Sequence, residues 1–279
     1  MGLMKLLNGA ELAAYIKERQ ARQVRALRQA HDVAPKLAIV LTTDNPVSKA
    51  YLRMKKRYGA DILIDVDLYE IKQQEAPALI KKLNGDDSVH GIIVQLPLAD
   101  TTQTEEIVNL VSADKDVDGL GKGAKFDPAT PLAIMWLLAG YNVDLGAGKQ
   151  VLLVGHGRLV GAPLEKLMIK GGVTPAVADK YTKDLKAETL KADVIVTATG
   201  KHGVIRPDMV KEKAVVVDAG VAGEGSKTVG DLAPEMYDRD DLTLTPHQGG
   251  VGPLTVCALF DNVIRAAQRV AERRQPVNS

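Results

Sequence analysis

The stretch that most limits the possible folds is VLLVGHGRLVGAP at residues 151–163. Its apolar start predicts a buried strand over Val151–Val154, and its three glycines predict a tight turn that leads into a helix. Such a turn lets backbone N–H groups and a helix N-terminus approach a pyrophosphate. Glycines at this spacing also occur in ordinary tight turns, so the pattern alone is weak. Its place between a strand and a helix favours a dinucleotide site.

Strand-like and helix-like segments alternate along the rest of the chain. Leu37–Thr42 and Gly91–Val94 are buried apolar runs, whereas the apolar residues of Ile62–Leu68 alternate with polar ones, as in a half-covered strand. This order predicts an α/β fold with parallel strands and right-handed crossovers. Further strands are expected at Ala176–Ala178, Val194–Ala198, Ala214–Asp218 and Leu242–Thr245, and helices at Leu12–Leu27, from Ser48, and at Ala76–Leu83, Thr104–Val111, Pro131–Gly140 and Thr255–Arg274.

The chain has 279 residues, enough for two domains that each bury a core. The segment Leu120–Asp127 is short, polar and glycine-containing, which places a domain boundary there. We expect residues 1–124 and 255–279 to form an N-terminal three-layer α/β catalytic domain. Residues 125–254 should form a Rossmann-like, doubly wound dinucleotide-binding domain, with a cleft between the two. The last helix is long enough to leave the second domain and pack on the first.

Composition excludes several classes of function. The formal net charge is +1, so no overall field attracts nucleic acid or anionic membranes. Cys257 is the single cysteine and the five histidines show no ligand spacing, so neither a disulfide nor a metal site is expected. No secretory pattern opens the chain and no apolar run reaches membrane-spanning length. We therefore expect a cytoplasmic protein that binds neither nucleic acid nor membrane.

Polar residues follow strands in the first half of the chain, where ligands of open α/β sheets bind. Ser48, Tyr51 and Lys55 lie on the helix after the first buried strand, and the last two share a face because they are four residues apart. Gln95 follows the buried run at Gly91–Val94, and Asp118 lies in a turn.

A flat heterocycle would suit these side chains. Tyr51 offers a stacking face, while Gln95 and Asp118 offer donors and acceptors. Lys55 acts as an acid or a base if burial brings its pKa toward neutrality. Each residue also has an ordinary structural interpretation: Tyr51 and Lys55 as surface residues, Gln95 as a polar cap and Asp118 as the cap of its turn.

Five motifs in order make the resemblance to a known family specific. They are Ser48-x-x-Tyr51-x-x-x-Lys55, Gln95-Leu96-Pro97-Leu98, Lys115-Asp116-Val117-Asp118-Gly119, Pro128-Ala129-Thr130-Pro131 and Gly249-Gly250-Val251-Gly252-Pro253-Leu254-Thr255. In these motifs the chain resembles the bifunctional methylenetetrahydrofolate dehydrogenase/methenyltetrahydrofolate cyclohydrolases of one-carbon metabolism. The likeness covers essentially the whole sequence.

The resemblance implies that NADP takes a hydride from methylenetetrahydrofolate, and that water then opens the methenyl product to 10-formyltetrahydrofolate. It implies that Lys55 is the lysine of the hydrolytic step, assisted by Gln95, with Tyr51 stacked on the folate and Asp118 at the pterin. Ser48, Leu96 and Pro97 would complete the folate site, and Gly252 and Pro253 would form a loop at its mouth. It also implies a homodimer. The cofactor would contact Gly155, His156, Gly157, Arg158, Leu159, Val160, Asp179, Lys180, Thr199, Gly200 and Val221.

The sequence leaves the cofactor open between NADP and NAD. Asp179 lies at the spacing of an acid that binds the ribose hydroxyls of NAD, whereas Lys180 and Arg158 suit the extra phosphate of NADP. Family habit favours NADP. The phosphate turn also departs from the family, which usually has an arginine followed by a serine where this chain has His156-Gly157-Arg158.

Two further departures keep a second interpretation open. The bridge between Gly119 and Pro128 is shorter than usual in the family, and His247-Gln248 replaces a Val-Pro pair beside the expected nicotinamide position. His247 either tunes hydride transfer or fills space. The alternatives are a single-activity, NAD-dependent methylenetetrahydrofolate dehydrogenase and a non-catalytic nucleotide-binding regulatory module.

Overall fold

The structure is a computed structural model that describes residues 5–224 and 227–274. The chain forms two compact units, divided at residues 13/14, 129/130 and 255/256. We call residues 5–13 with 130–255 the large-sheet unit, and residues 14–129 with 256–274 the small-sheet unit. Two long helices, α1 (Gly9–His31) and α8 (Val251–Arg274), begin in the first and continue into the second. The domain limits expected from the sequence differ from these units mainly at residues 5–13, because β1 (Lys5–Leu6) pairs with the large sheet.

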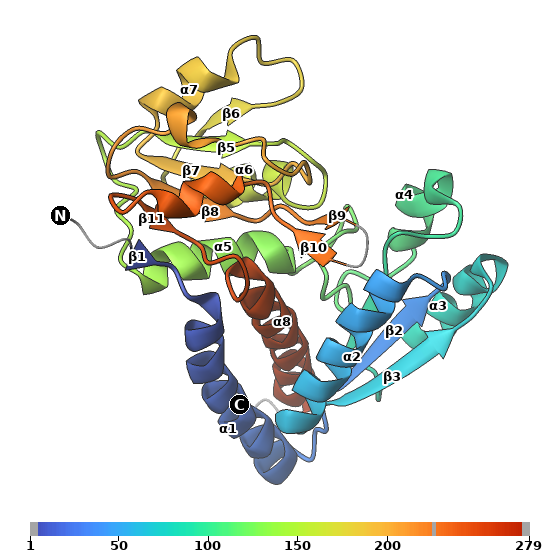
Figure 1. The fold of residues 1–279 in the computed structure, drawn as a ribbon. Helices are drawn as coiled ribbons and strands as arrows, with labels where there is room; N and C mark the ends of the chain where they lie inside the picture. Colours follow the sequence, from blue (N-terminus) through green and yellow to red (C-terminus); the bar gives the residue numbers. More distant parts are fainter. Residues whose placement is uncertain (1–4, 225–226, 275–279) are drawn as a thin grey trace. The chain divides into compact units, whose positions relative to one another are not determined.

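The large sheet has six parallel strands in the order β1-β11-β8-β7-β5-β6 (Figure 1). Apart from the edge strand β1, the chain enters this sheet at β5, places β6 on one side and then returns to build β7, β8 and β11 on the other. The order therefore reverses between β5 and β7, which is the switch point where doubly wound sheets bind ligands. The strands are β5 (Val151–Val154), β6 (Ala176–Ala178), β7 (Val194–Thr197), β8 (Val215–Asp218) and β11 (Thr243–Leu244).

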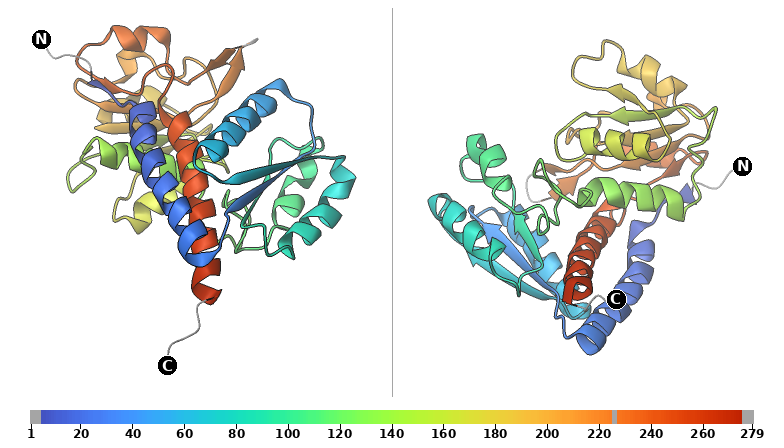
Figure 2. Two further views of the ribbon diagram at one scale, coloured as in Figure 1. Left: turned by 90° about the horizontal axis from the view of Figure 1, so that it is seen from below. Right: turned by 180° about the vertical axis from the view of Figure 1, so that it is seen from behind.

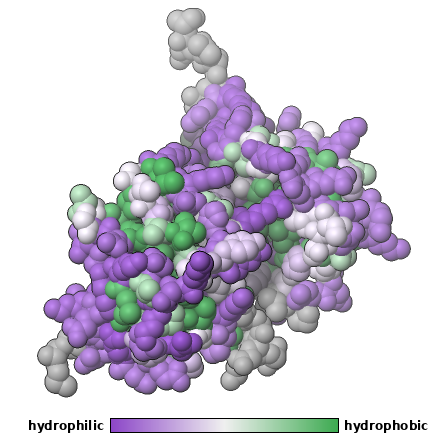
Figure 3. Space-filling model, turned by 90° about the horizontal axis from the view of Figure 1, so that it is seen from above, coloured by the Kyte–Doolittle hydropathy of each residue, from purple (hydrophilic) through white to green (hydrophobic). Residues whose placement is uncertain are grey.

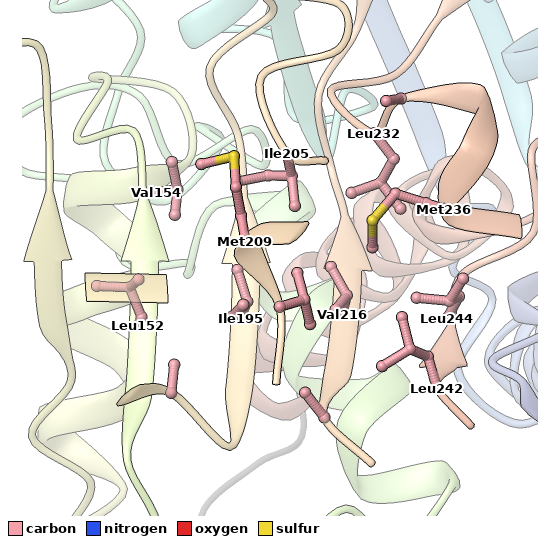
Figure 4. Close-up of a cluster of buried hydrophobic side chains, with 14 of the residues drawn as sticks. Leu152, Val154, Ile195, Ile205, Met209, Val216, Leu232, Met236, Leu242 and Leu244 are labelled. Carbon is pink, nitrogen blue, oxygen red and sulfur yellow. The ribbon is translucent and has the colours of Figure 1, made fainter. Parts of the chain in front are cut away.

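Side chains from four neighbouring strands form the core of the large-sheet unit (Figure 4). Leu152, Ile195, Val216 and Leu244 lie side by side across it, and all four residues of β5 and of β7 are buried. Strands covered on both faces are expected to be continuously apolar. The other elements here are α5 (Ala129–Gly140), α6 (Gly161–Lys170), α7 (Leu185–Lys191), the 3-10 helices η3 (Pro207–Met209) and η4 (Pro234–Asp238), and an antiparallel pair, β9 (Ala222–Glu224) with β10 (Lys227–Val229).

The small sheet has three parallel strands in the order β3-β2-β4. A further segment lies along β4, since Asp116 forms a parallel bridge with Ile92 and the Ile92 N–H bonds to the carbonyl of Lys115 at 2.7 Å. The carboxyl end of this segment therefore lies at the same edge as the end of β4. The elements are β2 (Lys36–Leu41), β3 (Asp65–Glu70), β4 (Gly91–Val94), α2 (Pro46–Asp61), η1 (Gln73–Glu75), α3 (Ala76–Asn84), η2 (Thr101–Gln103) and α4 (Thr104–Val108).

In the small-sheet unit, α1 and α8 run side by side (Figure 2), and Tyr58 near the end of α2 contacts both helices. The amide of Gln20 donates to the carbonyl of Cys257 at 2.9 Å, and the rings of Tyr58 and Phe260 are 5.1 Å apart. Asn262 is fully buried and donates to two loop carbonyls, those of Val117 and Asp127, both at 2.9 Å. Helix α8 therefore fixes the segment that carries Asp118.

The elements differ from the sequence predictions at several ends. The strand expected from Ile62 begins only at Asp65, since Ile62 and Ile64 are buried within the turn after α2, where Leu63 has a φ of 64°. The helix predicted over Thr104–Val111 ends at Val108, and the last helix begins at Val251 rather than Thr255.

Polar residues cover most of the face shown in Figure 3, with apolar groups between them. Within residues 5–224 and 227–274, no helix combines the length and the apolar character needed to cross a membrane.

Candidate active site

A lysine and an amide meet at the edge of the small sheet. Lys55 lies one turn after Tyr51 on α2, and its Nζ donates to Oε1 of Gln95 at 2.9 Å. Gln95 follows β4 directly, and its own amide donates to the carbonyl of Leu96 at 3.0 Å. The backbone N–H of Gln95 also bonds to the carbonyl of Val40, at 2.9 Å. The glutamine is thus fixed at both ends, and its oxygen points at the lysine.

Asp118 adds a negative charge to this pair. Its segment runs along β4, which brings its carboxylate to the edge where Gln95 lies. Burial lowers the pKa of Lys55, and the charge of Asp118 opposes that shift. Burial raises the pKa of Asp118, and Lys55 opposes it in turn. Each group therefore favours the charged form of the other, while the apolar surroundings disfavour both charges.

The turn that presents Asp118 is held by its neighbour Asp116, which the sequence reasoning overlooked. The buried carboxylate of Asp116 accepts the N–H groups of Gly119 at 3.0 Å and Gly121 at 2.7 Å. Gly119 has a φ of +69°, a conformation that favours glycine. Asp116 therefore caps the turn, which leaves the carboxylate of Asp118 beside Lys55. The D-x-D-G pattern was the available signal, since an aspartate readily accepts N–H groups a few residues later.

The other residues of the predicted folate site lie near this edge in different degrees of burial. Tyr51 is half-buried, and burial raises the pKa of its phenol. Ser48 is buried on the same helix. The Leu96–Pro97 peptide is cis; Leu96 is half-buried and Pro97 is exposed.

The glycine turn after β5 is shaped by close backbone packing. Gly155 has a φ of +97°, and a Cβ there would lie 2.7 Å from the carbonyl oxygen of Ala198. A Cβ on Gly161 would lie 2.0 Å from the carbonyl oxygen of Gly155. A Cβ on Gly157 would have no described atom within 4 Å. Glycine is therefore needed for packing at 155 and 161, whereas at 157 it leaves open space over the turn.

The polar residues of this turn are exposed. His156 pairs with Glu165 of α6, with 2.8 Å between Nε2 and Oε2. Arg158 and Leu159 are exposed, and Val160 is half-buried.

The remaining predicted cofactor residues follow the neighbouring strands of the large sheet. After β6, the carboxylate of Asp179 accepts the N–H of Tyr181 at 2.9 Å, and Nζ of Lys180 lies 4.9 Å from the centre of the Tyr181 ring. Thr199 and Gly200 follow β7, and the exposed Val221 follows β8. These segments lie at the carboxyl ends of β6, β7 and β8.

The segment around residue 250 differs from its sequence prediction. Gly252 and Pro253 were expected in a loop, but they lie in the first turn of α8, where a proline is tolerated. Both belong to the large-sheet unit. The ring of His247 stacks on Tyr237 with centroids 3.5 Å apart. In the described parts of the chain, no three His, Cys, Asp or Glu side chains gather as a metal site would require.

The large sheet is doubly wound and has a glycine turn at its switch point, and the chain also forms a second sheet that carries a lysine, an amide and a carboxylate. These features define a two-domain α/β enzyme of the dinucleotide-binding type. Comparison with known proteins gives the particular family. Residues 7–118 match the model for the catalytic domain, and residues 128–271 the model for the NAD(P)-binding domain, of tetrahydrofolate dehydrogenase/cyclohydrolase. The chain belongs to this family.

Individual relatives are similar over nearly their whole length. The bifunctional protein FolD of Nitratiruptor sp. is 38% identical over 95% of this chain and 99% of its own. The crystal structure of FolD from Campylobacter jejuni has a TM-score of 0.89 at 37% identity, covering 96% of this chain and 99% of that one. The Trypanosoma brucei FolD structure, complexed with NADP and an inhibitor, has a TM-score of 0.90 at 26% identity and covers 99% and 100%.

Proposed function

We propose that the protein oxidises methylenetetrahydrofolate to methenyltetrahydrofolate with NADP and then hydrolyses this product to 10-formyltetrahydrofolate, as part of one-carbon metabolism. The hydrogen bond between Lys55 and Gln95, with Asp118 beside it, is the observation that carries the proposal. The relatives support it, because the Nitratiruptor protein is named bifunctional and the Campylobacter jejuni FolD is named a methylenetetrahydrofolate dehydrogenase/cyclohydrolase.

Lys55 supplies the base of the hydrolytic step. Burial already lowers the pKa of its amine, and the cationic methenyl bridge of the substrate would disfavour the ammonium form further. The neutral amine then accepts a proton from water as the water oxygen bonds to the methenyl carbon. Gln95 Oε1 fixes the direction of Nζ during this transfer.

The same amine then acts as the acid. The bond between the former methenyl carbon and N5 breaks, the hydroxyl proton leaves to solvent, and N5 receives the proton held by Lys55. The formyl group remains on N10, so one water is consumed and one proton released. Asp118 favours the ammonium form between the two steps, since its charge opposes the loss of that proton. Tyr51 packs its ring on the pterin, and its raised pKa keeps the phenol neutral.

The turn at 155–161 fits a dinucleotide. The open space at Gly157 and the exposed backbone of this turn allow a pyrophosphate to approach the start of α6. When bound, NADP supplies the hydride acceptor for the methylene carbon. Lys180 and Arg158 are exposed cations on the segments after β6 and β5, which suits the additional phosphate of NADP.

The single-activity alternative rested on the short bridge between Gly119 and Pro128. That bridge is anchored at both ends: Gly121 bonds to Asp116, and the carbonyl of Asp127 accepts from Asn262 at 2.9 Å. The contact between Lys55 and Gln95 is present with this bridge in place, which supports the bifunctional interpretation.

Lys55→Met tests the proposal, with Lys56→Met as the matched control because Lys56 is exposed one residue further along α2. Loss of a general acid–base should lower the rate of methenyltetrahydrofolate hydrolysis by about 10²–10⁴-fold, with folate binding retained. Lys56→Met should hydrolyse at the wild-type rate. Unchanged hydrolysis in Lys55→Met would refute the role of this amine. Reduction of NADP by the wild type with methylenetetrahydrofolate, followed in the same cuvette, tests the first reaction.

Two further parts of the proposal rest on the family resemblance. We propose a homodimer, which light scattering at micromolar concentration checks directly. We also propose a cytoplasmic location, consistent with a chain that has a single cysteine; fractionation of the producing cells tests it.

A further inference from the structure

A fully buried carboxylate that the proposed chemistry does not use lies in the large-sheet unit. Asp231 accepts three hydrogen bonds from the short segment Thr197–Lys201. Its Oδ2 accepts the hydroxyl of Thr197 and the backbone N–H of Thr199, both at 2.6 Å. Its Oδ1 accepts the backbone N–H of Lys201 at 3.0 Å. One side chain therefore fixes the course of the chain as it leaves β7.

A second aspartate holds Asp231 itself. Asp218, the last residue of β8, accepts the backbone N–H groups of Gly220 at 2.9 Å, Asp231 at 3.0 Å and Leu232 at 3.1 Å. Burial raises the pKa of Asp218, so these donors are what favours its ionised form. The ends of β7 and β8 are thus connected through two carboxylates.

Glycines make this arrangement possible on both sides. A Cβ on Gly220 would lie 2.0 Å from Oδ1 of Asp231, and a Cβ on Gly230 would lie 2.0 Å from Oδ2 of Asp218. Each backbone therefore lies directly against the carboxylate of the other segment, and only glycine leaves room for it.

The held segments are the ones that border the dinucleotide turn. Ala198 lies between Thr197 and Thr199, which both donate to Asp231. Its carbonyl oxygen packs so closely on the glycine turn that a Cβ on Gly155 would lie only 2.7 Å from it. We propose that Asp231 is a positioning residue for the cofactor: it fixes Thr199 and Gly200 against the glycine turn in the geometry that binds the dinucleotide. This inference rests on the proposed function, because it presumes that the cofactor binds at this switch point.

The chemistry favours a carboxylate over its amide. Asp231 presents two acceptor oxygens to three donors, whereas asparagine presents one oxygen and an NH₂ group. In Asp231→Asn, either Lys201 or both threonine donors must face that NH₂, so the segment has to shift or lose a buried hydrogen bond. The size and shape of the side chain are otherwise preserved, so the substitution changes the hydrogen bonds and the charge at this position without leaving a cavity.

The experiment compares Asp231→Asn with Asp193→Asn. Asp193 lies at the opposite end of the same sheet, where it accepts the N–H of Gln150 at 2.8 Å and pairs with Lys211. We expect the dissociation constant of NADPH, measured by its fluorescence, to rise at least tenfold in Asp231→Asn and to change less than twofold in Asp193→Asn. Hydrolysis of methenyltetrahydrofolate without cofactor should stay within twofold in both.

A purely structural role would lower the melting temperature of Asp231→Asn and leave its NADPH affinity unchanged at 25 °C, and that result overturns the inference. If Asp231→Asn does not fold, Thr197→Val decides, since it removes one of the three donors and should raise the dissociation constant two- to fivefold. An unchanged value there also overturns the inference. Titration of the wild type distinguishes failure of the proposed function from failure of this inference. If the wild type binds neither NADPH nor NADH, both the proposed function and this inference are refuted. If the wild type binds NADPH and the variants bind it equally well, only this inference is refuted.

Discussion

Replacing Gly161 with alanine tests whether the close backbone packing of the glycine turn is needed for cofactor binding. The new Cβ would lie 2.0 Å from the carbonyl oxygen of Gly155 and 2.8 Å from the Cα of His156. A Cβ essentially never comes within 3.0 Å of a heavy atom outside its own residue and its two chain neighbours, so the start of α6 must move by about 1 Å. Overpacking of this kind costs about 1–3 kcal/mol of folding free energy.

Urea unfolding and NADPH titration measure the two consequences separately. We expect the free energy of unfolding of Gly161→Ala to fall by about 1–3 kcal/mol and the dissociation constant of NADPH to rise at least tenfold. Gly157→Ala is the matched control for stability, because its Cβ would meet no described atom within 4 Å. A Gly161→Ala protein with wild-type stability and wild-type affinity would refute this account of the turn.

Three other predictions concern the small-sheet unit and the choice of cofactor. Asn262→Leu removes two buried hydrogen bonds to the carbonyls of Val117 and Asp127, so urea unfolding should show a loss of about 2–4 kcal/mol; a loss below 1 kcal/mol would contradict this. Burial, with nearby cations, lowers the pKa of His90 to about 4, against about 6.5 when unfolded. As the pH falls, the unfolded chain therefore binds a proton at His90 before the folded chain does. The free energy of unfolding should decrease by about 3 kcal/mol between pH 6.5 and pH 4. Urea unfolding at a series of pH values measures this decrease, which His90→Gln should lack. Lys180→Ala should raise the KM for NADP several-fold and leave that for NAD unchanged, whereas the exposed Lys183→Ala should affect neither; equal effects on both cofactors would exclude contact with the extra phosphate.

Five of the six strands of the large sheet could be predicted closely from the sequence, whereas the two-residue edge strand β1 was not predicted. The predicted limits of β5 and β6 agree with the structure, and β7 differs by one residue. These strands are short and bounded by turn residues, and β5 and β7 are buried on both faces, so apolar runs identify them directly. The alternation at Ile62–Leu68 led to a strand that was predicted to begin too early. Ile62 and Ile64 are buried two residues apart, as in a strand, but they lie in the turn before β3.

The candidate sites were predictable only in part. Lys55 and Tyr51 share a helix face through local spacing, and Gln95 follows a recognisable strand, so their proximity could be argued from the sequence. Asp116 and Asp231 could not be assigned in this way. The D-x-D-G pattern indicates that an aspartate caps the turn, but not which of Asp116 and Asp118 does so and which faces Lys55. The partners of Asp231 lie about 30 residues away in the chain.

The small-sheet unit is assembled from two stretches of sequence separated by the whole of residues 130–255. Asn262 and Phe260, from the second stretch, are fully buried in it. During synthesis on the ribosome, the part of this unit that carries Lys55 therefore stays without α8, with its apolar surface exposed, until more than a hundred later residues have been synthesised. A chaperone that binds exposed apolar segments would have its longest opportunity on this unit, and a nonsense codon before α8 would disable the proposed catalytic lysine, which is encoded some two hundred codons earlier.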